Sequence, residues 1–190
     1  MKILKTNVIS LSVLISLLLG ACSSPIKEEH IEACKQENEG FKKQSEQMDI
    51  TNKKLTLKQE ARYSEMMASV DPKKKKLFAK NEQLLAKISE KRQQLKTLDN
   101  KHRILTDSVK SVITENDSFI IALPKGDVGI KEADSKWSAN KQKLNEYWAS
   151  EENLLKEIEV KQNDLNMLYD LVSAQYGKTQ KKTKKHKKSL

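Results

Sequence analysis

Proline, glycine, cysteine and aromatic residues are all scarce in this sequence of 190 residues. It has three prolines, five glycines and two cysteines, and aromatic residues make up 5% of it. With so few helix breakers, long helices can run uninterrupted, and with so few aromatic residues a wide globular core is not expected. Charged residues, in contrast, make up 33% of the chain. The composition therefore predicts long helices that pack along narrow apolar seams.

The sequence also lacks side chains in a catalytic arrangement. The three histidines, His30, His102 and His186, are scattered along the chain, and the glycines around residue 126 lack the spacing of a phosphate-binding loop. His30 and Cys34 lie four residues apart and could share a helix face, but a zinc site needs a second pair of ligands that the sequence does not offer. We therefore expect no enzymatic activity, no soluble cofactor and no metal site.

The N-terminus has the pattern of an export signal. Lys2 and Lys5 precede an apolar run from Val8 to Leu19 that only three serines interrupt. A basic segment followed by such a run is typical of a secretory signal peptide. The run is short for a permanent membrane span, which needs about 20 apolar residues. We predict that residues 1–21 are removed; an uncleaved anchor and a buried helix are the alternatives.

The junction after this run carries a four-residue motif. Leu19-Gly20-Ala21-Cys22 resembles the lipobox of bacterial lipoprotein precursors, a resemblance that covers only the signal and its junction. It implies cleavage before Cys22, a thioether-linked diacylglycerol on the sulfur and an acyl chain on the new amino group. Ser23 follows where an aspartate would retain many Gram-negative lipoproteins at the inner membrane. The resemblance therefore implies a protein of the cell envelope, anchored by membrane lipid at Cys22 and located at the outer membrane in a Gram-negative cell.

Cys34 is left without an intramolecular partner if Cys22 carries lipid. Outside the cytoplasm, where disulfides persist, two interpretations remain open. Either Cys34 is a packed free thiol, or it links two copies of the chain through an intermolecular disulfide and so forms a homo-oligomer.

Positive charge is concentrated at the C-terminal end of a chain whose formal net charge is +10. Residues 178–190 contain seven lysines and no acid, so this segment is expected to be disordered and solvated. The candidate polyanion-binding residues are Lys178, Lys181, Lys182, Lys184, Lys185, Lys187 and Lys188. Outside the cytoplasm they fit peptidoglycan, lipopolysaccharide or anionic lipid, whereas nucleic acid is a poor fit. A solubilising tail without a partner is the alternative.

Rare prolines and glycines divide the rest of the chain. Asp71 and Pro72 have the pattern of a helix N-cap followed by proline in the first turn. A second break is predicted over residues 117–134, and Gly177 stands where a helix C-cap is expected. The predicted pieces are a lipidated tether (22–26) and a body (27–177) with helices over residues 27–70, 73–116 and 132–176.

Apolar residues in these stretches follow a heptad pattern, which is clear in the second and third and half polar in the first. The seam of the second stretch consists of Leu77, Asn81, Leu84, Ile88, Lys91, Leu95, Leu98, His102, Leu105, Val109, Val112 and Asn116. The seam of the third consists of Trp137, Lys141, Leu144, Trp148, Glu151, Leu155, Ile158, Gln162, Leu165, Tyr169, Val172 and Tyr176. The seam of the first consists of Cys34, Asn38, Phe41, Ser45, Met48, Asn52, Leu55 and Gln59.

These patterns predict an all-α fold, either an elongated helical hairpin or a three-helix antiparallel coiled coil, followed by the disordered basic tail. The matched lengths of the second and third helices favour an antiparallel pair. The sequence leaves open whether the first helix folds back along the others or extends away from them. His102 is interpreted as a polar seam residue that fixes register, and Trp137 and Trp148 as core residues instead of an aromatic binding platform.

In general layout the chain resembles the helical outer-membrane lipoproteins that tie the membrane to peptidoglycan. Its sequence ends in Ser189-Leu190 instead of the terminal lysine through which those proteins are attached covalently, so any contact with the cell wall is expected to be electrostatic. The leading hypothesis is a membrane-anchored, non-enzymatic coiled-coil spacer or scaffold of the envelope. The alternative is a surface-exposed binding lipoprotein, such as an adhesin or exclusion factor, that recognises a protein partner through its helices.

Overall fold

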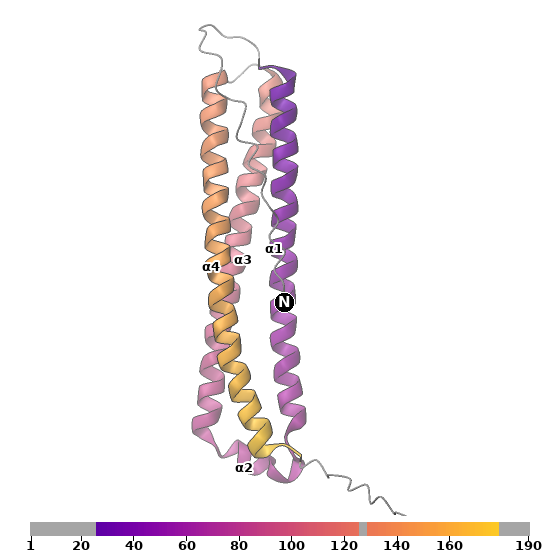
Figure 1. Cartoon of the computed structure of the whole chain (residues 1–190), viewed down its shortest axis with the longest axis vertical. Helices are drawn as coiled ribbons and strands as arrows, with labels where there is room; N and C mark the ends of the chain where they lie inside the picture. Colours follow the sequence, from indigo (N-terminus) through magenta and orange to yellow (C-terminus); the bar gives the residue numbers. More distant parts are fainter. Residues whose placement is uncertain (1–25, 126–128, 179–190) are drawn as a thin grey trace, which may run out of the picture.

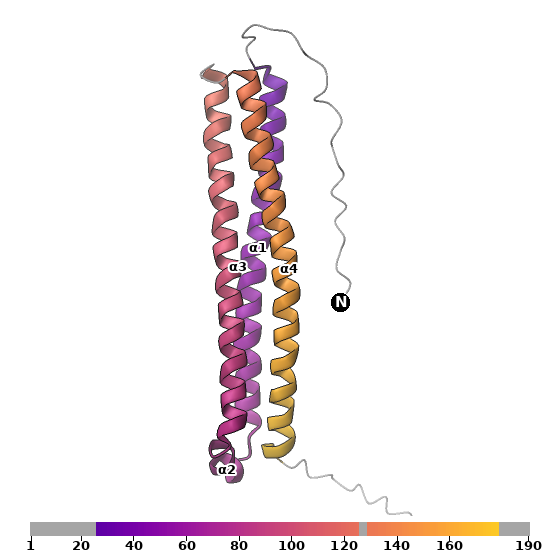
Figure 2. The same ribbon diagram turned by 90° about the vertical axis from the view of Figure 1, so that its left-hand side faces the viewer.

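The computed structural model describes residues 26–125 and 129–178, which fold into a bundle of three long helices (Figures 1 and 2). The elements are α1 (Glu28–Ser69), the 3-10 turn η1 (Pro72–Lys74), α2 (Lys75–Ala79), α3 (Glu82–Ala122), the 3-10 turn η2 (Leu123–Lys125) and α4 (Ile130–Tyr176). Helix α3 runs antiparallel to both α1 and α4, and it packs against each of them. The predicted all-α, three-helix antiparallel coiled coil is therefore confirmed, and the first helix folds back along the others.

The bundle is a rod. Its longest helix, α4, has 47 residues and spans about 70 Å at 1.5 Å per residue. Among the residues that the structure describes, no helix is long and apolar enough to cross a membrane. The predicted signal peptide and all but one residue of the tail lie outside the described residues.

The buried side chains follow the predicted heptads. Helix α3 buries Leu84, Ile88, Leu95, Leu98, His102, Val109, Val112 and Asn116 at seam positions, and α4 buries Leu144, Ile158, Gln162, Leu165, Tyr169, Val172 and Tyr176. Helix α1 contributes Phe41 and Met48 together with the polar Asn38 and Ser45. Each large apolar side chain that is fully buried contributes about 1.5–3 kcal/mol. A narrow core of this kind extends over the whole length of the rod.

The start of the second long helix differs from the prediction. A single helix from residue 73 was expected, but the chain forms η1 and the short α2 before α3 begins at Glu82. Pro72 begins the 3-10 turn, and the Asp71 side chain caps it by accepting a hydrogen bond from the Lys73 amide at 2.9 Å. Asn81, predicted as a seam residue, is instead the N-cap of α3 and accepts from the Leu84 amide at 3.1 Å.

This connection also reverses one core assignment. Leu77 was expected in the seam, but 62% of its surface is exposed, whereas its neighbour Phe78 is buried. The Phe78 ring packs on Tyr176 near the end of α4, with 5.3 Å between ring centroids. The prediction for Leu77 was wrong because the break at Asn81 rotates α2 out of the heptad register of α3.

The predicted break over residues 117–134 was too long. Helix α3 continues to Ala122, and α4 begins at Ile130. Phe119, Ile120 and Leu123 are buried in one cluster with Ile31 and Ala133, so this apolar run prolongs the seam of α3 and closes the upper end of the core. Helix α3 therefore ends only after most of this apolar run, directly before the segment that contains Pro124 and Gly126.

A layer of three asparagines, one from each long helix, crosses the core. Asn140 of α4 donates to the side-chain carbonyl of Asn116 at 2.8 Å, and Asn116 of α3 donates to that of Asn38 at 3.1 Å. Asn38 of α1 donates to Asp117 at 2.8 Å, and Asp117 also pairs with Lys42 at 2.9 Å. All three asparagines are buried. Because each amide has its partner on another helix, the layer is satisfied only when the three helices are aligned in this register.

The lower end of the rod is closed by backbone hydrogen bonds between segments far apart in the sequence. Val70 and Gly177 form an antiparallel bridge, the Asp71 amide donates to the Tyr176 carbonyl at 2.8 Å, and the Lys178 amide donates to the Ser69 carbonyl at 3.2 Å. Gly177 follows α4 as predicted, but its backbone is extended. These bonds, called here the clasp, fix the end of α4 to the end of α1.

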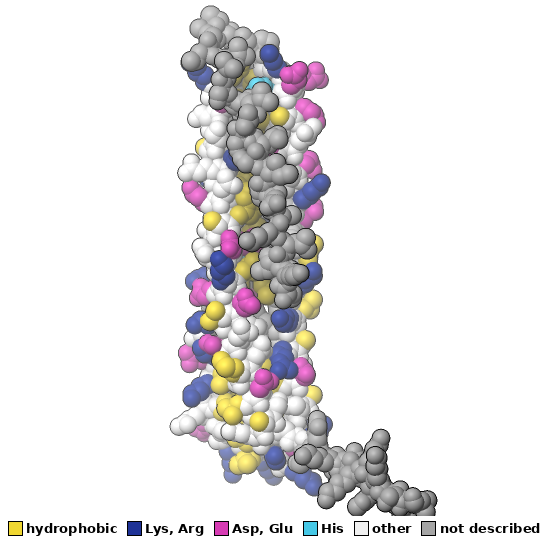
Figure 3. Space-filling model, in the orientation of Figure 1, with side chains coloured by type: hydrophobic (Ala, Val, Ile, Leu, Met, Phe, Trp, Pro, Cys, Tyr) yellow, Lys and Arg dark blue, Asp and Glu magenta, His cyan; other side chains and the backbone are white. Residues whose placement is uncertain are grey.

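The sides of the rod carry charges of both signs. In the view of Figure 3, basic and acidic side chains are interspersed along the length of the bundle. Some of them pair between helices, as Lys91 does with Asp164 at 2.8 Å and Lys110 with Asp49 at 2.6 Å. Exposed pairs of this kind contribute at most about 1 kcal/mol each, so the core and its polar layer dominate the stability.

Replacing Asn116 by alanine tests the asparagine layer. The change leaves the side-chain carbonyl of Asn38 and the amide of Asn140 buried without their partner, so the free energy of unfolding is expected to fall by about 2 to 4 kcal/mol. Urea unfolding followed by circular dichroism measures it. The matched control is Asn163→Ala on the exposed face of α4, which should change stability by less than about 0.5 kcal/mol. Equal stability of the two variants would contradict a structural role for the layer.

Candidate functional site

The described residues next to the predicted anchor and next to the predicted basic tail lie at opposite ends of the rod. Ile26, the first described residue, lies at the upper end in Figure 1, next to the start of α1 and the connection between α3 and α4. Lys178, the last described residue, is exposed at the lower end, next to the clasp. Cys22 and the tail lysines Lys181, Lys182, Lys184, Lys185, Lys187 and Lys188 lie outside the described residues.

Cys34 lies on α1 near the upper end and is half-buried. It packs against the cluster that contains Ile31 and Phe119. Burial, together with the nearby carboxylates of Glu37 and Asp134, raises the pKa of the Cys34 thiol to about 11. Because the thiolate is the form that attacks disulfides, Cys34 reacts slowly at neutral pH. An intermolecular disulfide at this position stays a prediction.

The other singled-out residues of the sequence take separate places. His30 is exposed, and the described residues contain no group of three or more His, Cys, Asp or Glu side chains arranged to hold a metal ion. Trp137 and Trp148 both pack around Phe41, with ring centroids 6.4 and 5.4 Å from it. The indole nitrogen of Trp137 also donates to Glu37 at 2.8 Å. Both tryptophans thus contribute to the seam, and neither forms a flat exposed platform.

His102 forms a second polar contact across the core. Its side chain is fully buried, and its Nε2 lies 3.1 Å from a carboxylate oxygen of Glu151 on α4. Its backbone carbonyl accepts a hydrogen bond from the Thr106 hydroxyl. His102 and Glu151 are both seam residues of the predicted heptads, so a polar pair occupies one core level in the middle of the rod. His102 is fully enclosed, whereas 17% of the Glu151 side chain is exposed.

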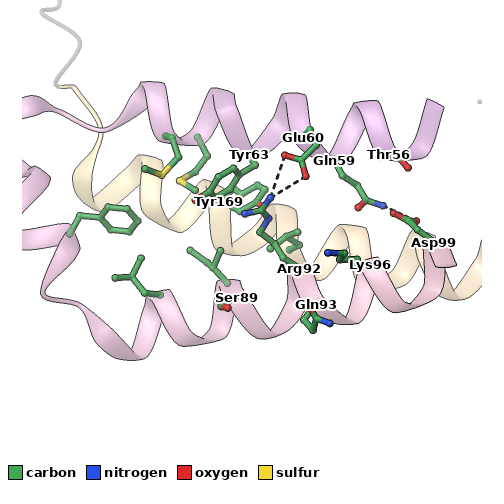
Figure 4. Close-up of a pocket in the computed structure, with 16 residues that line it drawn as sticks. Thr56, Gln59, Glu60, Tyr63, Ser89, Arg92, Gln93, Lys96, Asp99 and Tyr169 are labelled. Carbon is green, nitrogen blue, oxygen red and sulfur yellow. Dashed lines mark hydrogen bonds and ion pairs between the residues drawn. The ribbon is translucent and has the colours of Figure 1, made fainter. Parts of the chain in front are cut away.

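A groove lies between α1 and α3 (Figure 4). It has a volume of about 600 Å³, which lies within the 300–1,000 Å³ range of small-molecule sites. Its inner wall is apolar and includes Met66 of α1, Ile88 of α3 and Leu165 of α4. Its rim is polar and includes Gln59, Glu60, Arg92, Lys96 and Asp99. The groove therefore has an apolar floor and a charged opening.

Arg92 crosses this opening. Its guanidinium lies 3.7 Å from the centre of the Tyr63 ring and donates to Glu60 at 3.1 Å (Figure 4). Tyr63 and Glu60 belong to α1, and Arg92 belongs to α3, so the contact joins the two helices where the groove separates them. A cation over an aromatic ring at a partly exposed site contributes about 0.5–1 kcal/mol. These contacts therefore join α1 to α3 at the rim of the groove and are not arranged for catalysis.

Burial shifts the pKa of two further groups in the groove, the Tyr169 hydroxyl and the Asp99 carboxyl. The Tyr169 hydroxyl is buried and has no hydrogen-bond partner among the described residues, and burial raises its pKa to about 12. Burial also raises the pKa of the Asp99 carboxyl, although the hydrogen bond from Gln59 at 3.2 Å and the nearby His102 act in the opposite direction. The residues that line the groove include no nucleophile paired with a base.

Sequence reasoning missed the groove, although one signal for it exists. The chain has only three arginines against 33 lysines, and two of them, Arg62 and Arg92, pair with acids on a neighbouring helix. Arginine forms geometrically defined pairs and stacks on aromatic rings better than lysine does. The rare arginines therefore mark where helices are tied together at the surface.

Comparison with known proteins yields no relative. No protein-family model, curated protein or solved structure matches this chain. Its interpretation depends on its own residues and on their geometry.

Asp99→Asn tests the cost of burying this carboxylate. An acid whose pKa is raised by folding destabilises the fold at pH values above that pKa, and the penalty disappears as the pH falls toward the unfolded value near 4. The amide keeps an oxygen for the Gln59 hydrogen bond and carries no charge. At pH 7 the variant is therefore expected to be more stable than the original chain by up to about 1 kcal/mol.

The measurement is urea unfolding at several pH values from 7 down to 4, where the difference between variant and original should shrink. Asp107→Asn, an exposed position on the same helix, serves as the control and should change stability by less than about 0.5 kcal/mol throughout. An Asp99→Asn variant less stable than the original at pH 7 would show that the charged form is favoured in the fold.

Proposed function

We propose that this chain is a membrane-anchored envelope lipoprotein that acts as a non-enzymatic spacer or scaffold. Lipid on Cys22 holds one end, the coiled coil keeps a fixed distance, and the basic tail contacts an anionic envelope polymer such as peptidoglycan or lipopolysaccharide. Support for the anchor comes from the apolar run before the lipobox-like motif at residues 19–22. Support for the spacer comes from the shape of the body.

The observation that carries the proposal is the separation of the two ends. Ile26 follows Cys22 by four residues, and Lys178 begins the segment with seven lysines. Since the three helices alternate in direction, these two residues lie at opposite ends of a rod about 70 Å long. An anchored chain of this geometry would present its basic segment far from the anchoring membrane, as a spacer requires.

The upper end of the rod is compatible with a nearby lipid surface. Ile121, in the last turn of α3, is 64% exposed, and Ile130, at the start of α4, is 41% exposed. Both lie at the end where the chain leads toward Cys22. Apolar side chains there would face the membrane that holds the lipid anchor.

A surface-exposed binding lipoprotein is the second candidate, and the groove between α1 and α3 favours it. Its apolar floor and the unpartnered Tyr169 hydroxyl are features of a binding site. Protease treatment of intact cells separates the two candidates. Digestion of the chain on intact cells supports surface recognition, and protection until the outer barrier is opened supports the spacer.

The anchor is tested by labelling cells with a clickable palmitate analogue. The chain with its original sequence is expected to incorporate label, and Cys22→Ser is expected to lose it, because the thioether on that sulfur precedes N-acylation. Cys34→Ser is the matched control and should label like the original. Label that persists in Cys22→Ser would remove the basis for the proposed anchor.

The tail is tested by co-sedimentation of the chain with purified peptidoglycan in rising salt. Binding is expected to weaken steeply between low and high salt, because ionic contacts at an exposed surface are screened. A variant in which the seven tail lysines are replaced by glutamine should lose most of the binding. As a control, seven exposed lysines on the sides of the rod are replaced instead. Unchanged binding by the tail variant would contradict the role of the tail.

A further inference from the structure

The connection between α1 and α3 gathers lysines at the lower end of the rod. Residues 70–81 contain five lysines and a single acid, Asp71. Lys73, Lys75, Lys76 and Lys80 are all exposed, and Lys178 is exposed beside them at the clasp. Figure 3 shows basic side chains clustered around an apolar patch at this end, in contrast to the mixed charges along the sides. Residues 72–80 and Lys178 are called the basic tip.

The lysines of the basic tip have no ionic partner in the described part of the chain. Among the described residues, Lys73, Lys75, Lys76 and Lys80 make no salt bridge, whereas lysines on the sides such as Lys91 do. The segments outside the described residues cannot supply acidic side chains either, since their single acid, Asp127, belongs to the connection between α3 and α4 at the other end of the rod.

One lysine of the tip has a structural role that the others do not share. The Lys74 ammonium donates to the backbone carbonyls of Gln175 at 3.1 Å and Gly177 at 3.5 Å. A cation at the C-terminal end of α4 is favourable because the helix dipole and its unpaired carbonyls make that end negative. Lys74 thus holds the tip against α4 and leaves the remaining lysines facing solvent.

An apolar side chain stands among these lysines and is held outward. Leu77 is 62% exposed, while the adjacent Phe78 is 5% exposed and packs on Tyr176. The Tyr176 hydroxyl in turn accepts a hydrogen bond from Asn81 at 2.9 Å. These contacts on both sides of α2 fix its rotation, so Leu77 cannot turn into the core without displacing Phe78.

We propose that the basic tip docks on an anionic phospholipid bilayer. The lysines would lie against lipid phosphates, where each contributes about fivefold to binding, and Leu77 would enter the interface between the headgroups. A soluble polyanion would use the lysines but give no place to Leu77, which is why the combination favours a bilayer. The proposal concerns the folded tip alone and does not depend on what the tail binds. In a chain anchored through Cys22, the tip would face a second membrane.

The test measures capture of vesicles by the full-length chain, made without acylation and carrying Cys34→Ser so that Cys22 is its single thiol. The chain is coupled through Cys22 to maleimide beads, which leaves the tip at the far end. Lys181, Lys182, Lys184, Lys185, Lys187 and Lys188 are replaced by glutamine so that the tail does not contribute. Fluorescent vesicles of phosphatidylglycerol and phosphatidylcholine are then added, with pure phosphatidylcholine vesicles measured in parallel.

In this background, beads are expected to capture the anionic vesicles in preference to the neutral ones. The tip variant, with Lys73→Gln, Lys75→Gln, Lys76→Gln and Lys80→Gln, should lose at least about tenfold of that capture. The matched side variant carries Lys53→Gln, Lys54→Gln, Lys58→Gln and Lys101→Gln, four exposed lysines on the sides of the rod, and should lose less than about twofold. Circular dichroism verifies that both variants keep the helices.

A second pair of variants tests the apolar contact. Leu77→Gln is expected to reduce capture by about threefold or more, whereas Leu57→Gln, at a 70% exposed position on the side of α1, should leave it unchanged. Equal capture by the tip and side variants, or no preference for anionic vesicles in the starting background, would overturn the proposal. Loss of capture with the lysine variant but not with Leu77→Gln would show that charge alone holds the vesicles, without insertion of Leu77, and would overturn the proposal as well.

Discussion

The register of the three long helices is set by a few buried polar groups. Apolar heptads alone allow a helix to slide by seven residues, or about 10 Å, and still bury similar side chains. The layer of Asn38, Asn116 and Asn140 removes this freedom, because a slipped helix would leave amides unpaired in the core. The contacts of His102 with Glu151 and of Asn81 with Tyr176 repeat the constraint at two lower levels. All other features of the rod, including the position of its ends, follow from this alignment.

The same alignment explains how the two ends come to differ. At the upper end, the apolar run at the end of α3 closes the core. At the lower end, the clasp requires α1 and α4 to finish at the same height, and the connection between α1 and α3 covers the core with Val70 and Phe78. The other side chains of that connection lie outside the core, so lysines can occupy these positions without any loss of core packing. The lipid-facing role proposed for the basic tip uses side chains that folding leaves free.

The heptad pattern predicted most of the fold because it is a local signal repeated over many turns. Most seam residues of α3 and α4 could be assigned by spacing alone, and so could the break at Asp71, but Lys141 of the predicted seam is exposed. The exposure of Leu77 could not be predicted in this way, because Leu77 and Phe78 are both apolar. Which of the two is buried depends on the contact of Phe78 with Tyr176, almost one hundred residues away. The half-polar seam of α1 had the same difficulty, since Asn38 looks unsuitable for a core until its partners on α3, Asn116 and Asp117, are known. The groove could not be predicted for the same reason, because it is formed by contacts between residues on different helices, such as that of Arg92 with Tyr63.

An odd number of long helices determines how the rod responds to force. The chain enters the bundle at one end and leaves it at the other, so tension between its two termini acts along the axis. Under that load the helices must slide past one another, and every core level, including the polar layers, resists at the same moment. A two-helix hairpin pulled at its adjacent termini would instead open one level at a time. The third helix therefore turns the body into a tension-bearing strut, and the clasp, where α1 and α4 end together, is where part of that load passes between them.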